Sequence, residues 1–96
     1  MNKEKIIKVL YEINNEIRQN YKAEVKGIFG SYVRKEQKEK SDVDILVKFF
    51  KGATLFDLVG LANYIEEKLK IKVDIVPVDT IREEIRENIL REVVYL

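Results

Sequence analysis

Short apolar runs that suit β-strands alternate along this chain with segments that have the periodicity of amphipathic helices. The three runs are Ala23–Phe29, Val43–Phe50 and Val73–Val76, and the second and third are dense in β-branched or aromatic residues. Helices that alternate with strands normally pack on the faces of one sheet. The sequence therefore predicts an α/β (α+β) fold, a small sheet flanked by helices in the order αβαβαβα.

Apolar residues three and four positions apart predict the helices. The first helix is expected from about Lys3 to Asn20 and a short second one from Ser31 to about Lys38. Thr54 can cap the third helix, and Thr80 with Glu83 forms a capping-box pattern that would open the last one. The inward positions of that last helix are expected to be Ile81, Ile85, Ile89 and Val93.

Size and composition narrow the class of protein. With 96 residues, 1–96 is expected to form a single domain. The net charge of only +1 argues against direct, non-specific nucleic-acid binding. No apolar run approaches the roughly 18–20 residues of a membrane span, so a cytoplasmic protein without membrane contact is expected. The absence of Cys and His leaves carboxylates, hydroxyls, Lys, Arg or a bound metal for any catalysis.

Three aspartates carry the chemical signal of the chain. Asp42 and Asp44 stand two apart at the start of a strand, so they project from the same face and can bind a divalent cation together. Asp74 lies inside the next apolar strand and can approach the same point if the two strands are neighbours. Taken alone, Asp42 after Ser41 also suits an ordinary turn. A charge among apolar strand residues is costly, however, and this favours a metal site at Asp44 and Asp74.

Gly30 and Ser31 stand between the first strand and the short helix, a place where backbone N–H groups can bind an anion. Arg34 lies three residues further on, on the same helical face, and could fork onto phosphate oxygens. A Gly-Ser pair in this position is usually only a turn and an N-cap, and most such arginines are solvated. The interpretation as a phosphate site therefore depends on the aspartates that follow.

The combination of Gly30-Ser31, a ten-residue gap, Asp42-x-Asp44 and an acid on the following strand resembles the signature of the DNA polymerase β-like nucleotidyltransferase superfamily. The short length and the segments around it resemble the minimal nucleotidyltransferase (MNT) branch. This resemblance implies a mixed sheet of the polymerase β-like nucleotidyltransferase fold. It also implies catalytic and Mg²⁺-binding roles for Asp42, Asp44 and Asp74, and a nucleotide-binding role for Gly30, Ser31 and Arg34.

The same resemblance implies an antitoxin. Members of the MNT branch are commonly paired with a HEPN-type ribonuclease toxin encoded next to them, and transfer of AMP from ATP to a toxin tyrosine is the implied reaction. One or two Mg²⁺ ions would assist it. Two other hypotheses stay open: an antitoxin that neutralises its partner only by binding, and a nucleotidyltransferase with a small-molecule acceptor. The oligomeric state is also open, and a glycosyltransferase is disfavoured because it needs a much larger domain.

Overall fold

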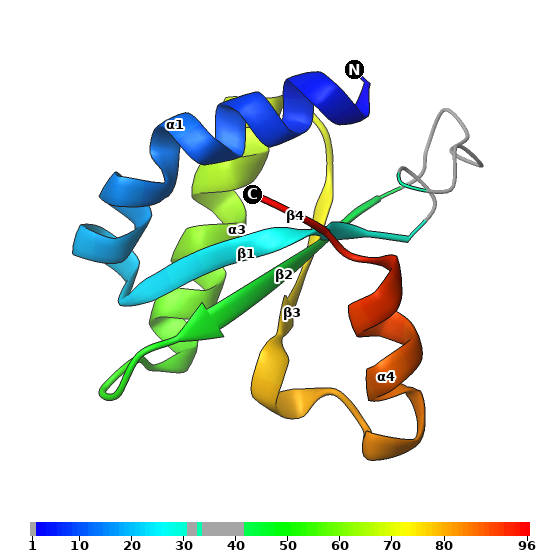
Figure 1. Ribbon diagram of the computed structural model, residues 1–96. Coiled ribbons are helices and arrows are strands. Elements are labelled where there is room, and N and C mark those ends of the chain that lie inside the picture. Colours follow the sequence, from blue (N-terminus) through cyan, green and yellow to red (C-terminus); the bar gives the residue numbers. More distant parts are fainter. Residues whose placement is uncertain (1, 31–32, 34–41) are drawn as a thin grey trace.

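The computed structural model describes residues 2–30, 33 and 42–96, and it forms a four-stranded sheet with helices packed on it (Figure 1). The expected helix from Ser31 to Lys38 lies outside the described residues, except for Val33, which is helical. The described elements are α1 (Lys3–Tyr21), β1 (Ala23–Phe29), β2 (Val43–Phe49), α3 (Leu55–Leu69), β3 (Val73–Pro77), the 3₁₀ helix η1 (Val78–Thr80), α4 (Glu83–Glu92) and β4 (Val94–Tyr95).

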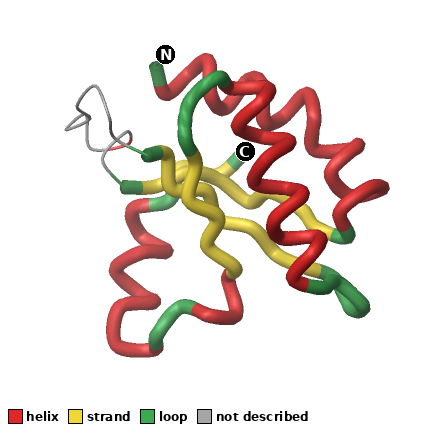
Figure 2. Tube along the Cα trace, turned by 180° about the vertical axis from the view of Figure 1, so that it is seen from behind, coloured by secondary structure: helices red, strands yellow, loops and turns green. Residues whose placement is uncertain are grey.

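The sheet is mixed, as expected. Its order is β3-β2-β1-β4, with β1 antiparallel to both β2 and β4, and β2 parallel to β3. Figure 2 shows α1 and α3 side by side, with α4 lying apart from them. The parallel pair arises because α3 connects β2 to β3 as a crossover helix. The predicted α/β (α+β) class is therefore confirmed.

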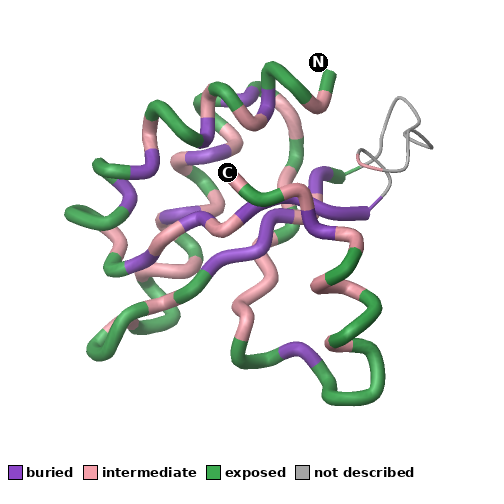
Figure 3. The backbone as a smooth tube through the Cα atoms, viewed as in Figure 1, coloured by how far each residue is buried: buried purple, intermediate pink, exposed green. Residues whose placement is uncertain are grey.

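Two groups of buried side chains hold the layers together. The larger one joins α1 and α3 to one face of β1 and β2, and the smaller one joins α4 to the other face. Figure 3 shows the buried residues concentrated on the strands and on the helices of the larger group, whereas α4 has no buried residue. The smaller cluster consists of Phe29, Leu46, Ile81 and Val93. Among the described elements, α1 and α3 thus cover one sheet face well, whereas α4 covers the other only in part.

The starts of α1 and α3 follow from local hydrogen bonds. Asn2 caps α1 by accepting a hydrogen bond from the Lys5 N–H at 2.9 Å. Thr54 is the N-cap of α3, as predicted, and its N–H donates to Asp57 Oδ2 at 2.8 Å. Within the described segments, no helix combines the length and apolar character needed to cross a bilayer.

The start of the last helix was predicted wrongly. Thr80 closes the 3₁₀ helix η1, where its hydroxyl donates to the Pro77 carbonyl at 2.9 Å, and α4 begins only at Glu83 with Arg82 as N-cap. The capping box of Thr80 and Glu83 is therefore absent. Of the four expected inward positions, Ile81 and Val93 are buried and Ile89 packs against the smaller cluster, whereas Ile85 is 47% exposed.

The strand β4 was not predicted. It pairs through Val94 and Tyr95 with Ile28 and Gly27 of β1, next to a β-bulge between Val25 and Gly27. A Cβ at Gly27 would stand 3.0 Å from the Tyr95 Cα atom, so the absence of a side chain lets β4 approach. Two residues paired over a long sequence distance leave no local pattern.

Asn14 of α1 completes the edge of β1 beyond the end of β4. Its Oδ1 accepts a hydrogen bond from the Val25 N–H at 2.9 Å, and its Nδ2 donates to the Val25 carbonyl at 3.1 Å. The Asn14 side chain is buried, and both backbone groups would lack these partners without it. This one amide therefore takes the place of a neighbouring strand.

We expect Asn14→Ala to lower the free energy of unfolding by about 2–4 kcal/mol, because it leaves a buried N–H and a buried carbonyl unsatisfied. Urea unfolding followed by circular dichroism measures the change. The matched control is Asn15→Ala, since Asn15 is exposed on the same helix and should change stability by less than about 0.5 kcal/mol. Equal effects of the two substitutions would contradict the assignment.

Candidate active site

Asp44 and Asp74 lie side by side on neighbouring strands. The parallel register pairs Asp44 of β2 with Asp74 of β3, and such partners project from the same face of a sheet. The Val43 N–H donates to the Lys72 carbonyl at 3.0 Å, which keeps the starts of the two strands level. Asp44 is half-buried and Asp74 is exposed. Two carboxylates from different strands are thus brought to one place.

The acids lie on the face of the sheet that α4 only partly covers. Leu46 stands two residues after Asp44 and belongs to the smaller buried cluster, and Val76, two residues after Asp74, packs against that cluster. Because alternate strand residues share a face, both acids are on this side. Asp42 is exposed and directly precedes β2, so it lies at the same end of the strand.

Gly30 lies against the carboxylate of Asp44. Phe29, the last residue of β1, pairs with Asp44, and Gly30 follows with a φ of +83°, a conformation that favours glycine. A Cβ at Gly30 would stand 3.0 Å from Asp44 Cγ and would collide with Oδ2. The sequence indicated Gly30 as a phosphate residue, but its contact with Asp44 depends on the β1–β2 register and has no sequence signal.

The other two predicted nucleotide ligands are not placed. Ser31 and Arg34 lie outside the described residues, so their nucleotide-binding role stays a prediction. Gly30 leads directly into this segment and Asp42 follows it directly. Both ends of the segment that contains Ser31 and Arg34 therefore lie near the aspartates.

The donor set fits a hard divalent cation. In residues 2–30, 33 and 42–96, no group of three Asp, Glu, His or Cys side chains gathers closely enough to hold a metal by itself. Magnesium is usually bound through one or two carboxylates together with substrate phosphates and waters, and not in an all-protein cage. Asp44 and Asp74, with Asp42 before them, match that kind of site.

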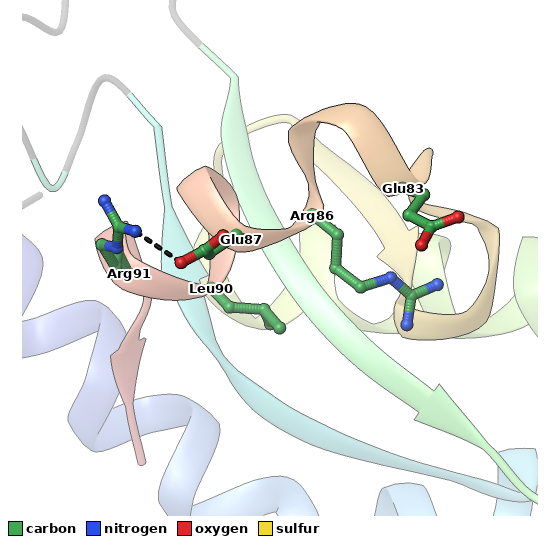
Figure 4. Close-up of a pocket in the computed structure, with 5 residues that line it drawn as sticks. All are labelled: Glu83, Arg86, Glu87, Leu90 and Arg91. Carbon is green, nitrogen blue, oxygen red and sulfur yellow. Dashed lines mark hydrogen bonds and ion pairs between the residues drawn. The ribbon is translucent and has the colours of Figure 1, made fainter.

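A hollow of about 500 Å³ lies along α4, but none of the three aspartates lines it (Figure 4). Three of its four charged side chains have partners: Arg91 pairs with Glu87, and Arg86 donates to the Ile81 carbonyl at 3.2 Å. Lined by residues of a single helix, this hollow lacks the converging acids of the sheet. We therefore place the candidate site at the aspartates.

Two of the described side chains with clearly shifted pKa values, Glu24 and Tyr64, belong to structural contacts. Hydrogen bonds from Arg18 and then Lys26 lower the pKa of the Glu24 carboxyl. The hydrogen bond from Tyr64 to Glu16, 2.6 Å long, favours the neutral phenol and raises the pKa of Tyr64 to about 12. Glu24 lies on β1 and the Tyr64–Glu16 pair joins α3 to α1, so both pKa shifts result from contacts between structural elements.

Comparison with known proteins gives a consistent picture. The sequence pattern of the nucleotidyltransferase domain matches residues 10–96. The protein adenylyltransferase MntA of Thermococcus cleftensis is 41% identical over 93 residues, which cover 97% of this chain and 94% of that protein. A solved structure assigned to the minimal nucleotidyltransferases has a TM-score of 0.83 at 33% identity, over 100% of this chain and 97% of its own. A crystal structure of a toxin-antitoxin with AMP-PNP has a TM-score of 0.69 at 25% identity, over 99% of this chain and 72% of its own.

Proposed function

Because the chain belongs to the nucleotidyltransferase domain family, we propose that it transfers AMP from ATP to a hydroxyl group of a partner toxin and so acts as an antitoxin. The observation that carries this proposal is the in-register pair of Asp44 and Asp74, with Gly30 against Asp44. The similarity to a protein adenylyltransferase supports AMP as the transferred group. The similarity to a toxin-antitoxin structure with AMP-PNP supports both the partner and the nucleotide.

Each residue near the site has a proposed task. Asp42 and Asp44 would hold Mg²⁺, which would offset the charge of the phosphates and assist departure of diphosphate. Gly30, with Ser31 and Arg34 of the following segment, would hold the outer phosphates, since a glycine lets phosphate oxygens approach backbone N–H groups. Asp74 would help to hold the same cation and would accept the proton of the acceptor hydroxyl.

The bond changes balance without a protein nucleophile. The acceptor oxygen forms a bond to the α-phosphorus of ATP, the bond from that phosphorus to the β-phosphate oxygen breaks, and diphosphate leaves. The acceptor proton passes to the Asp74 carboxylate, which is exposed and can release it to water. Such a transfer depends on positioning and charge stabilisation, which suits a chain that contains neither Cys nor His.

The acceptor is proposed to be a tyrosine of a HEPN-type toxin encoded beside this chain, and the reaction to take place in the cytoplasm, where ATP and Mg²⁺ are supplied. The toxin-antitoxin similarity supports a protein acceptor over a small molecule. A protein acceptor also fits the geometry, because the side chains of Asp42 and Asp74 are exposed.

Intact-mass spectrometry tests the proposal. The purified chain, the toxin encoded beside it and Mg²⁺-ATP are mixed, and the toxin is expected to gain the mass of AMP on a tyrosine together with loss of its ribonuclease activity. Chelation of the divalent cation should prevent the gain. Neutralisation of an unmodified toxin would instead identify an antitoxin that acts by binding alone.

A further inference from the structure

The beginning of α3 presents large apolar side chains to solvent. Leu55 is 73% exposed, Phe56 88% and Val59 52%, and we call these three residues the α3 patch. Further along the helix, Asn63 and Glu67 are exposed at the next positions of the same face. A surface helix is normally polar on its outer side throughout. The apolar character is therefore confined to the first turns of α3, and folding does not require it.

A hollow adjoins the α3 patch. It has a volume of about 310 Å³ and is lined by Leu55, Leu58, Phe49, Ala53 and Thr54. Phe50, 38% exposed, lies in the turn that leads to α3. Binding surfaces of proteins concentrate their energy where an apolar or aromatic anchor of the partner enters such a pocket. The patch and the hollow together have the form of such a surface.

Two lysines and one carboxylate lie near the α3 patch, so positive charge is in excess there. The turn before α3 carries Lys51, and the Lys22 side chain reaches the same turn, since a Cβ at Gly52 would stand 3.8 Å from Lys22 Nζ. The nearby carboxylate of Asp57 accepts the Thr54 N–H at the helix cap. A symmetric pair of copies of this chain would bring like charges together, because such an interface is self-complementary. A partner with acidic residues around an apolar segment fits better.

From these observations we propose that the α3 patch is the surface on which the partner toxin docks, through an apolar helix flanked by acidic residues. The inference rests on the proposed function for the identity of the partner. Phe56 and Val59 contact this helix, an apolar anchor fills the hollow beside Leu55, and Lys51 attracts the acidic flank. The α3 patch then supplies affinity, separately from the acids that supply chemistry.

The α3 patch and the aspartates lie at opposite ends of β2. The strand runs from Asp44 near its start to Phe49 at its end, which corresponds to about 17 Å at 3.3–3.4 Å per residue. Figure 1 shows the turn from β2 to α3 on the opposite side of the molecule from the start of β2. A toxin held at the α3 patch must therefore extend along the sheet to present its acceptor, or a second toxin copy must present it.

Isothermal titration calorimetry with the purified toxin encoded beside this chain tests the proposal. Phe56→Glu and Val59→Glu are each expected to raise the dissociation constant at least about 30-fold, as for central residues of an interface. The matched control is Asn63→Glu, on the same exposed helix face, for which a change below about threefold is expected. Thermal unfolding within about 2 °C of the unchanged protein verifies that the exposed substitutions leave the fold intact.

Activity measurements separate this inference from the proposed function. With Phe56→Glu, AMP transfer should recover at saturating toxin, with a raised KM and an unchanged kcat. If the chain transfers AMP but Phe56→Glu binds the toxin normally, the docking inference is wrong and the proposed function stands. If the toxin binds in a Phe56-dependent way without AMP transfer, the proposed function is wrong and the docking inference stands.

Three further outcomes would overturn the docking inference. The first is the absence of any complex with the toxin. The second is a Phe56-dependent dimer of this chain alone in sedimentation velocity. The third is Phe56-dependent co-sedimentation with vesicles of phosphatidylcholine and phosphatidylserine, which would assign the patch to a lipid surface.

Discussion

Asp44→Asn is expected to lower the rate of AMP transfer by at least about 10³-fold, equivalent to about 4 kcal/mol of transition-state stabilisation. The substitution keeps the size of the half-buried side chain but removes the negative charge beside Asp74 and Gly30. One fewer anionic oxygen would then be available to a cation that screens the phosphates. Single-turnover transfer of labelled AMP to the toxin measures the effect.

The control for this substitution is Asp79→Asn. Asp79 is an exposed aspartate in η1, beyond the other end of β3, and its loss should change the rate by less than about twofold. A rate for Asp44→Asn within about tenfold of the unchanged protein would remove the aspartates from the mechanism. The toxin-binding affinity of Asp44→Asn should stay the same, because the α3 patch lies at the other end of β2.

Gly30→Ala is expected to lower kcat/KM for AMP transfer by at least about 100-fold, or about 2.7 kcal/mol. The added methyl group would collide with Asp44 Oδ2, so either the carboxylate or the chain leading into Ser31 must move. A displacement of about 1 Å in a catalytic group can cost two orders of magnitude in rate. The left-handed φ of +83° adds a backbone cost of about 1 kcal/mol.

Gly52→Ala separates the effect of the collision with Asp44 from the effect of the left-handed backbone conformation. Gly52 also has a left-handed φ, of +92°, but a Cβ there would meet only Lys22 Nζ at 3.8 Å, far from the aspartates. We expect Gly52→Ala to lose about 1 kcal/mol of stability while keeping its kcat at saturating toxin, because the turn of Gly52 adjoins the α3 patch and not the aspartates. Denaturant unfolding and transfer kinetics on both variants make the comparison. Equal activity of the two variants would show that close approach to Asp44 is not needed.

The sequence predicted those parts of the fold that depend on local pattern. The periodic apolar residues of α1 and α3 and the dense apolar runs of β2 and β3 are visible without knowledge of their neighbours. The start of α4 was wrong because Thr80 and Glu83 fit a capping box locally, whereas the Pro77 carbonyl takes the Thr80 hydroxyl. β4 was missed because its pairing depends on Gly27, far away in the sequence.

The candidate site divides in the same way. The spacing of Asp42 and Asp44 predicts that they share one face, since side chains alternate along a strand. That Asp74 lies next to Asp44 could only be assumed, because strand order and register are long-range properties. The structure gives both. The contact of Gly30 with Asp44 depends on a bulged β1–β2 pairing, which no local pattern encodes.

The Asn14 side chain at the border of β1 bears on how this chain can assemble. Unpaired strand borders invite backbone-to-backbone addition of foreign strands, which leads to β-augmentation or to fibrils. Here Asn14 occupies part of one edge of the sheet, where β4 is only two residues long. At the other edge, β3 ends in Pro77, which has no N–H to donate. Assembly through added strands is therefore disfavoured relative to association through side-chain surfaces such as the α3 patch.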